Sequence, residues 1–207
     1  MTAPVKTKKK SEGPRLTRDD WLDASFQAVV EGGFENVRVL VIADALGVTR
    51  GSFYWHFVDH ADLVGALLAR WRERELEQDK RLSADSLPDP QADLERLLDT
   101  VLSLAGVDPE NIRFELALRG FGRRDPDVAQ MLVEVDQARM NLFEQKFLRL
   151  TGNPKSAGEL ASLFYLAIVG SYQALSRPVN PPMIKEYLKG IIAHYLIRQQ
   201  VPARPPA

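Results

Sequence analysis

Three ring-bearing side chains stand next to one another at Tyr54, Trp55 and His56, with Phe53 before them and Phe57 after them. A tyrosine hydroxyl or a histidine nitrogen can donate a hydrogen bond to a phosphate oxygen, and ring edges can pack on a sugar or a thymine methyl group. In a helix, residues four apart share a face, so the two phenylalanines point together and Trp55 points nearly the opposite way. We therefore expect the phenylalanines in the core and the Tyr-Trp-His run on an exposed rim.

The residues just before the rings suit a polyanionic partner. Thr49 is a good N-cap for a short helix, whose first backbone N–H groups would point toward a phosphate. Arg50 is the best candidate for a bidentate contact with a base or a phosphate, and Gly51 lets the backbone approach closely. Ser52 flanks the same face. The alternative is that the cluster is core, which is the more common role of aromatic residues on a short helix.

Metal binding and catalysis find little support in the residue pattern. His56 and His60 are four residues apart, but Phe57 stands where the zinc-protease motif needs glutamate, and an expected helix break separates the two histidines. His194 is alone in the last expected helix. Because no Ser-His-Asp arrangement, glycine-rich phosphate loop or metal-ligand cluster can be placed, we expect no metal, no cofactor and no enzymatic activity.

The composition bounds the class of protein. The chain has 207 residues, of which 45% are hydrophobic, and no cysteine. This length allows one large domain or a small domain joined to a larger one, and disulfides and cysteine-rich zinc sites are excluded. The longest strongly apolar stretch, 160–168, is far shorter than the roughly 20 residues of a membrane span, and we see no signal peptide. We expect a soluble, cytoplasmic protein with no membrane partner.

Charge is nearly balanced overall, with a net charge of −1, but it is uneven along the chain. Residues 1–18 contain six cationic side chains and one glutamate. Such a basic arm beside a first helix can follow phosphates or enter a minor groove, and a solvated tail is the alternative. We expect residues 1–14 to form a disordered basic arm and the proline-rich residues 201–207 a disordered tail.

Apolar residues recur at intervals of three and four along nearly the whole chain, which predicts an all-α protein of about nine helices. A first helix begins at a Thr17 capping box and stops at Gly32-Gly33, and short helices follow over 39–46 and from Thr49. Three helices with a glycine turn before the third match a helix-turn-helix, whose last helix enters the major groove. The later helices are expected over 61–81, 91–105, 109–120, 127–150, 157–176 and 182–200. We assign residues 15–60 to a helix-turn-helix domain and residues 61–200 to a C-terminal domain.

The run IADALGVTRGSFYWHFVDHADLV is similar to the TetR family of transcriptional regulators. Ile42-Ala43, Gly47-Val48, the aromatic-aromatic-His-Phe run at 54–57 and Leu63 fill the places of the family pattern, and the close resemblance covers about residues 17–68. The resemblance implies double-stranded DNA as a partner and DNA contacts from Thr49, Arg50, Gly51, Ser52, Tyr54, Trp55 and His56.

Two positions depart from that pattern. The family often has threonine and then a basic residue at the start of the second helix, whereas this chain has Arg38 followed by three aliphatic residues. A base contact from there is doubtful, although Arg38 could reach a phosphate. His60 stands where the family usually has a phosphate-binding lysine. Because an imidazole is only partly charged at neutral pH, its contact with DNA is expected to be weaker and pH-dependent.

The last two expected helices carry more apolar surface than a monomer core needs, because the helix over 157–176 is apolar on nearly every side. The resemblance implies that they form a four-helix interface in a homodimer, which would present two recognition helices about one DNA turn apart. The alternative is a large monomer core. The residues expected at the interface are Leu163, Phe164, Ala167, Ile168, Tyr172, Ile191 and Tyr195.

The middle helices are expected to hold an unknown small-molecule effector, as the resemblance implies. The apolar candidates for this ligand-binding site are Leu102, Phe114, Leu118, Phe121, Met131, Met140 and Phe143, and ordinary core is their alternative role. Arg113, Glu115 and Arg139 would either orient a ligand or be salt-bridged surface positions. Together the sequence predicts a homodimeric repressor released from a palindromic operator by its effector. The alternative is a helical ligand-binding or enzyme-like bundle with a structural N-terminal domain.

Overall fold

The computed structural model describes residues 16–173, 186–187 and 190–191. These residues form eight α-helices and one 3-10 turn, with no strand among them, which confirms the all-α prediction. The helices are α1 (Arg18–Gly32), α2 (Val39–Ala45), α3 (Arg50–Phe53), α4 (His60–Ala84), α5 (Pro90–Val107), α6 (Pro109–Gly122), α7 (Pro126–Thr151) and α8 (Pro154–Gln173), and the 3-10 turn is Phe34–Asn36. The basic arm, the C-terminal tail and most of the ninth expected helix lie outside the described residues.

Local sequence signals set most helix ends. The Thr17 side chain and the Asp20 backbone N–H form the predicted capping box, with Asp20 Oδ2 accepting from the Thr17 backbone N–H at 2.6 Å. Asp108 and Asp125 cap α6 and α7, and in each helix a proline takes the first position, where no backbone donor is needed. At the end of α7, Gly152 adopts a left-handed conformation with φ of 64°.

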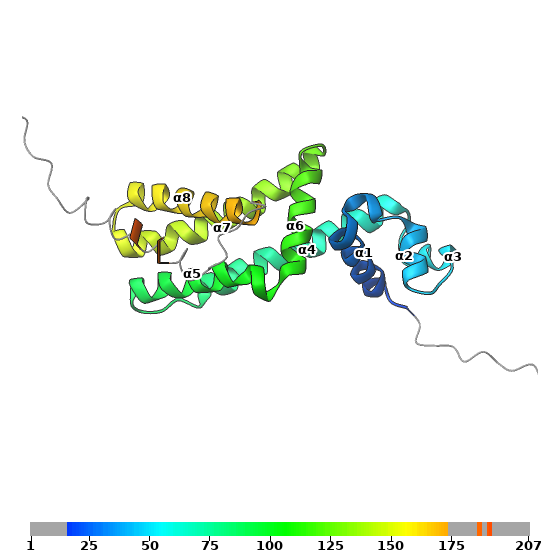
Figure 1. Cartoon of the computed structure of the whole chain (residues 1–207), viewed down its shortest axis with the longest axis horizontal. Helices are drawn as coiled ribbons and strands as arrows, with labels where there is room; N and C mark the ends of the chain where they lie inside the picture. The colour runs from blue at the N-terminus through cyan, green and yellow to red at the C-terminus, as the bar shows by residue number, and fades with distance from the viewer. Residues whose placement is uncertain (1–15, 174–185, 188–189, 192–207) are drawn as a thin grey trace, which may run out of the picture.

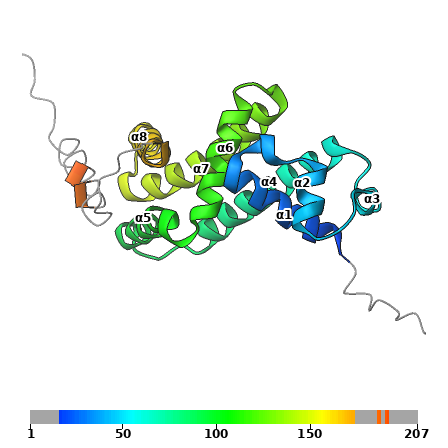
Figure 2. The same ribbon diagram turned by 45° about the vertical axis from the view of Figure 1, so that its right-hand side comes forward.

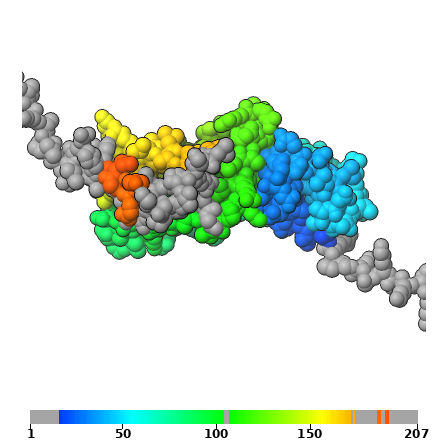
Figure 3. Space-filling view, viewed as in Figure 1, coloured from blue at the N-terminus to red at the C-terminus, as the bar shows by residue number. Residues whose placement is uncertain are grey.

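Helices α1 to α3 gather at one end of an elongated molecule (Figure 1). The 25-residue α4 leads from that end into the bundle of α5, α7 and α8, over a length of about 38 Å at 1.5 Å per residue. In the turned view α3 stands at the outer tip, far from α5 and α8 (Figure 2). The blue surface of this end meets the green surface that includes α6 (Figure 3).

Two hydrophobic cores hold these parts together. The first joins the N-terminal helices to α4, α6 and α7, and its centre includes Trp21, Phe53 and Leu67 together with Phe114 and Leu118. The second lies between α5, α7 and α8. Because α6 contributes large side chains to the first core, the N-terminal helices cannot shift independently of it without opening a packed interior.

The expected dimer residues divide into two groups. Phe164 and Ile168 are buried in the second core of their own chain, and Phe164 packs edge-on to Phe147 with 5.3 Å between ring centres. A side chain enclosed by its own helices offers no surface to a partner, so the burial of these two residues gives no support to their predicted place in a dimer interface. Leu163, Ala167 and Ile191 are exposed and keep that prediction. Tyr195 and the side chain of Tyr172 lie outside the described residues.

Candidate functional site

The turn between α2 and α3 depends on Gly47, which adopts φ of 66°, a conformation that side-chain-bearing residues rarely take. The backbone N–H of Val48 returns to the carbonyl of Ala43 at 2.9 Å, so the turn closes on the end of α2. Ile42 and Ala43 are buried and fix α2 against the core. The glycine turn and the apolar pair thus orient α3.

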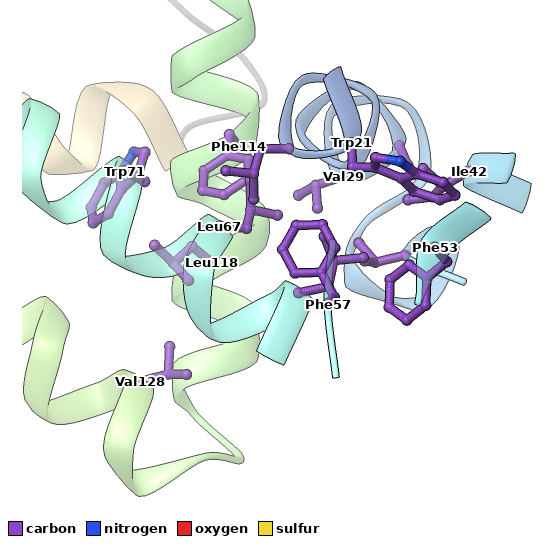
Figure 4. Packing of buried hydrophobic residues seen from close by; sticks show 14 of the residues in the cluster. Trp21, Val29, Ile42, Phe53, Phe57, Leu67, Trp71, Phe114, Leu118 and Val128 are labelled. Atoms are coloured by element: carbon purple, nitrogen blue, oxygen red, sulfur yellow. The ribbon is translucent and has the colours of Figure 1, made fainter. Parts of the chain in front are cut away.

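Phe53 and Phe57 are the predicted anchors, and both are buried. Phe53 meets the indole of Trp21 edge-on, with 5.4 Å between ring centres, and stacks on Phe57 at 5.5 Å. Figure 4 shows both phenylalanines lying among side chains of α1, α2 and α4. One detail differs from the expectation: α3 ends at Phe53, and Phe57 lies in the turn that follows. The backbone N–H of Phe57 still bonds the carbonyl of Phe53 at 3.1 Å, which keeps the two rings on one side.

The outward assignment of the rim is confirmed for Tyr54 and Trp55, whose exposed fractions are 54% and 81%. His56 is only partly exposed, because its ring faces Trp21 at 6.4 Å between centres. Two aliphatic side chains that are not among the predicted DNA contacts, Leu40 on α2 and Val58 after the rings, are also exposed at this end. Exposed apolar groups beside Tyr54 and Trp55 are suited to packing against thymine methyl groups.

Arg50 and Tyr54 are linked across one turn, since the Arg50 guanidinium donates to the Tyr54 hydroxyl at 3.1 Å. Thr49 occupies the N-cap position of α3 as predicted, but its side chain makes no capping hydrogen bond. Gly51 is exposed, and a Cβ built there would meet only Thr49 Oγ1, at an ordinary 3.7 Å. The protein's own packing therefore does not require glycine at this place. Ser52, beside it, is partly exposed.

Arg38 and His60 lie at the starts of α2 and α4. Arg38 is exposed at the N-cap of α2, where it is free to approach a phosphate. His60 Nε2 lies 2.5 Å from the Val37 carbonyl oxygen. Because a carbonyl can only accept, this nitrogen is the donor, and Nδ1 is left to face a partner. His60 thus offers a partner one ring nitrogen, whereas a lysine would offer a freely rotating ammonium.

Residues 22–67, which include α2, α3 and the turn between them, match the sequence family described as "Bacterial regulatory proteins, tetR family". TtgR of Pseudomonas putida is 29% identical over 106 residues, which are 51% of this chain and 50% of TtgR. AcrR of Shigella flexneri is 26% identical over 193 residues, 93% of this chain and 84% of AcrR. Over residues 22–67, the helix-turn-helix of this chain is that of the TetR family.

The chain spans about half the length of TtgR. The fold extends the likeness: a transcriptional regulator from Rhodococcus sp. Rha1 superposes with a TM-score of 0.68 at 18% identity, covering 87% of this chain and 97% of that one. The match to a family of regulatory proteins favours the prediction of a DNA-binding regulator over the alternative of an enzyme-like helical bundle. Within the described ranges, no helix is long and apolar enough to cross a membrane, and no three His, Asp or Glu side chains gather as a metal site.

The C-terminal part of the chain contains a cavity of about 70 Å³ between α4, α5, α6, α7 and α8. Of the seven expected ligand-binding residues, only Phe143 lines it. Phe114, Leu118, Phe121 and Met131 belong to the first core, and Leu102 and Met140 pack on the second. These six residues therefore lie outside this cavity, because an apolar residue on a central helix packs equally well on a neighbouring helix, and their assignment to an effector site stays a prediction.

The cavity wall is instead marked by buried charge. Arg139 bridges Glu75 and Glu115, with nitrogen–oxygen distances of 2.6 Å and 2.9 Å, and the Asn111 amide donates to Glu75 at 3.0 Å. Burial opposes ionisation of Glu115, but the charges and hydrogen bonds of Arg139 and Arg119 outweigh it and hold the pKa of Glu115 below its usual value. Glu115 and Arg139 are therefore salt-bridged, as one of their two predicted roles required, but they are not surface positions.

Arg113, by contrast, is exposed, in agreement with the surface reading. The network continues away from the cavity through Arg119, which contacts both Glu115 and Asp136 at 2.7 Å. A sequence signal for this network existed on α4, where Leu63, Leu67, Trp71 and Glu75 are all buried at four-residue intervals. A carboxylate that continues an apolar stripe must find a partner inside the protein.

Proposed function

We propose that this chain is a homodimeric transcriptional repressor that binds a palindromic operator through α3 and leaves it when a small molecule enters the cavity. Residues 15–60 would form the DNA-binding domain and residues 61–200 the ligand-binding and dimerisation domain. The repressor would act in the cytoplasm, where its operator lies. The observation that carries the proposal is the exposure of Tyr54 and Trp55 on a segment whose two phenylalanines are fully anchored.

Exposed aromatic rings on a rigid support are costly unless a partner covers them. Leaving a side chain as large as Trp55 in water forgoes about 1.5–3 kcal/mol of burial. The DNA contacts would come from Thr49, Arg50, Gly51, Ser52, Tyr54, Trp55 and His56, with phosphate contacts from Arg38 and His60. A structural N-terminal domain, as the alternative bundle requires, would have no use for this exposed surface.

The dimer would be completed by α8 and the segment around Ile191. Leu163 and Leu166 on α8 are both large, apolar and exposed, Leu166 to 68%. Ala167 and Gly170 follow Leu166 on α8 and are exposed as well, which would allow a partner helix to approach closely. A two-fold axis through this face would pair each α8 with its copy and set the spacing of the two α3 segments.

Helix α6 would couple effector binding in the cavity to operator binding by the N-terminal helices. Phe114 on α6 stacks on Phe26 of α1 with 4.8 Å between ring centres, whereas the next residue, Glu115, lines the cavity. A ligand that alters the Glu115–Arg139 contact would shift α6, and the shared core would carry α1 with it. This works only if the two positions of α6 differ in affinity for both the ligand and the operator.

A mobility shift of the full chain against the DNA flanking its own gene tests the proposal. We expect specific binding that weakens by roughly 10³–10⁵ between 50 and 200 mM salt if about 6–10 phosphates are contacted. A scrambled duplex of the same composition is the control. Binding that is equal for both duplexes, or insensitive to salt, would contradict the proposed function.

A further inference from the structure

Two buried oxygen atoms in the cavity wall have no hydrogen-bond donor among the described residues: Asp79 Oδ2 on α4 and Asn111 Oδ1 on α6. Asn111 is only 8% exposed, and its amide nitrogen is committed to Glu75 Oε1 at 3.0 Å. The carboxylate can only accept from that nitrogen, so the amide orientation is fixed and Oδ1 remains unsatisfied. Buried acceptors are normally paired, so two unpaired ones on facing helices indicate that the cavity is built for a donor.

The charges of the lining side chains also favour a ligand that donates hydrogen bonds and carries a positive charge. Four carboxylates line the cavity, from Glu75, Asp79, Asp108 and Glu115, against the single cation Arg139. Arg139 is already bound to Glu75 and Glu115, and Asp108 is paired with an arginine of α4. Within the described part of the chain, Asp79 is thus the lining carboxylate that no cation contacts.

The environment of Asp79 makes that charge unfavourable. Burial raises the pKa of Asp79 to about 6, with Arg139 opposing the rise and the carboxylates of Glu75 and Glu115 adding to it. Above that pH the carboxylate is ionised in a largely enclosed space. A positive charge from outside the protein would relieve both the burial and the repulsion.

We propose that the effector is an organic cation, a protonated amine carrying a short apolar group. Its ammonium donates hydrogen bonds to Asp79 Oδ2 and Asn111 Oδ1, and its apolar part lies against the lining side chains Leu142, Phe143 and Val169. The inference rests on the proposed function in taking this cavity as the effector site. An anion would meet four carboxylates, and a neutral molecule would leave Asp79 without a counter-charge.

The cavity limits the size of the first probes. A volume of about 70 Å³ has room for roughly half a dozen water-sized groups. Pentylammonium, 1-pentanol and pentanoate share one apolar chain and differ in the head group, which is cationic, neutral or anionic. Their affinities for the full chain are measured at pH 7.5 by titration calorimetry without DNA.

We expect pentylammonium to bind more tightly than 1-pentanol by roughly ten-fold or more, as a charge-assisted hydrogen bond implies, and pentanoate to bind most weakly. The Asp79→Asn variant should lose that preference for the cation and keep its affinity for the alcohol. Glu73→Gln removes an exposed carboxylate of α4 outside the cavity and should change neither affinity. A cation that binds no better than the alcohol, including no binding at all, overturns the proposal, as does an unchanged preference in Asp79→Asn.

These outcomes are separable from those of the operator experiment because no DNA is present. A chain that binds its operator but shows no preference for the cation keeps its proposed function and loses this effector class. A chain that prefers the cation through Asp79 but fails to bind the operator keeps the ligand site and loses the repressor assignment.

Discussion

The guanidinium of Arg50 lies 3.1 Å from the hydroxyl of Tyr54, and both side chains are exposed. The contact spans one turn that begins in α3. The buried Phe53 ring packs edge-on against the ring of Tyr54, with 5.2 Å between ring centres. A cation and a hydroxyl held side by side on a rigid base can address adjacent phosphates or a phosphate and a base edge. The two residues are thus preorganised for one partner before it arrives.

A substitution at Gly51 tests whether the backbone of α3 approaches the DNA closely. Gly51→Ala should leave the free energy of unfolding unchanged or raise it by up to about 1 kcal/mol, since alanine favours helix and meets no neighbour in the chain. Operator affinity should nevertheless fall, because the added methyl group stands between α3 and the DNA. Gly65→Ala, at an exposed and open position of α4, is the matched control and should leave operator affinity intact. Equal operator affinity in both variants would remove Gly51 from the interface.

Arg139 tests the buried network. Arg139→Met should lower the free energy of unfolding by about 3–5 kcal/mol, because Glu75 and Glu115 lose their shared cation inside the protein. Chemical denaturation monitored by circular dichroism measures the change. Arg72→Met, which breaks an exposed ion pair with Glu134, should cost no more than about 1 kcal/mol. Similar losses of unfolding free energy in the two variants would mean that the buried ion pairs stabilise the fold no more than an exposed ion pair does.

The raised pKa of Asp79 predicts a pH-dependent effect of Asp79→Asn on stability. The usual value is 3.8 and the folded value about 6, so protonation of Asp79 stabilises the fold below pH 3.8, and that contribution is lost as the pH rises through 6. At pH 7.5 the asparagine variant should therefore be more stable than the parent chain, by roughly 1–2 kcal/mol after allowing for partial solvent exposure. Denaturation curves at pH 4 and 7.5 check this. An advantage of equal size at both pH values would contradict the assignment.

The exposed face of α8 predicts how the chain assembles. Leu166→Glu should convert the dimer to a monomer, because the substitution places a charge in the apolar face that is proposed as the interface. Size-exclusion chromatography with light scattering measures the mass. Val133→Glu makes the same change at an exposed position of α7 and should leave the dimer intact. A dimer that survives Leu166→Glu would place the interface elsewhere.

The sequence predicted the N-terminal helices well because their signals are local. The capping box at Thr17, the glycine turn at Gly47 and the four-residue spacing of Phe53 and Phe57 each act within one or two turns of the chain. Helix starts and stops elsewhere were within a few residues for the same reason, since proline and aspartate stand at most of them.

The cavity could not be predicted in this way, because its wall combines residues far apart in the chain. Glu75, Glu115 and Arg139 come from three helices, and only their meeting in space makes them a site. Most of the apolar candidates lie outside the cavity for a related reason. Phe114 and Glu115 are neighbours in sequence, yet one enters the core shared with α1 and the other lines the cavity. The choice between those sides depends on which helices surround α6.

We expect a division of roles in which Tyr54 faces DNA and Phe53, one residue earlier, anchors the fold. Operator affinity and the free energy of unfolding, measured on the same preparations of Tyr54→Ala and Phe53→Ala, test it most directly. Tyr54→Ala should weaken operator binding by about 1–3 kcal/mol with nearly unchanged stability. Phe53→Ala should lower the free energy of unfolding by about 3–5 kcal/mol, as deletion of a buried ring does. If Tyr54→Ala unfolds as readily as Phe53→Ala, or binds the operator as the parent chain does, this division of roles is contradicted.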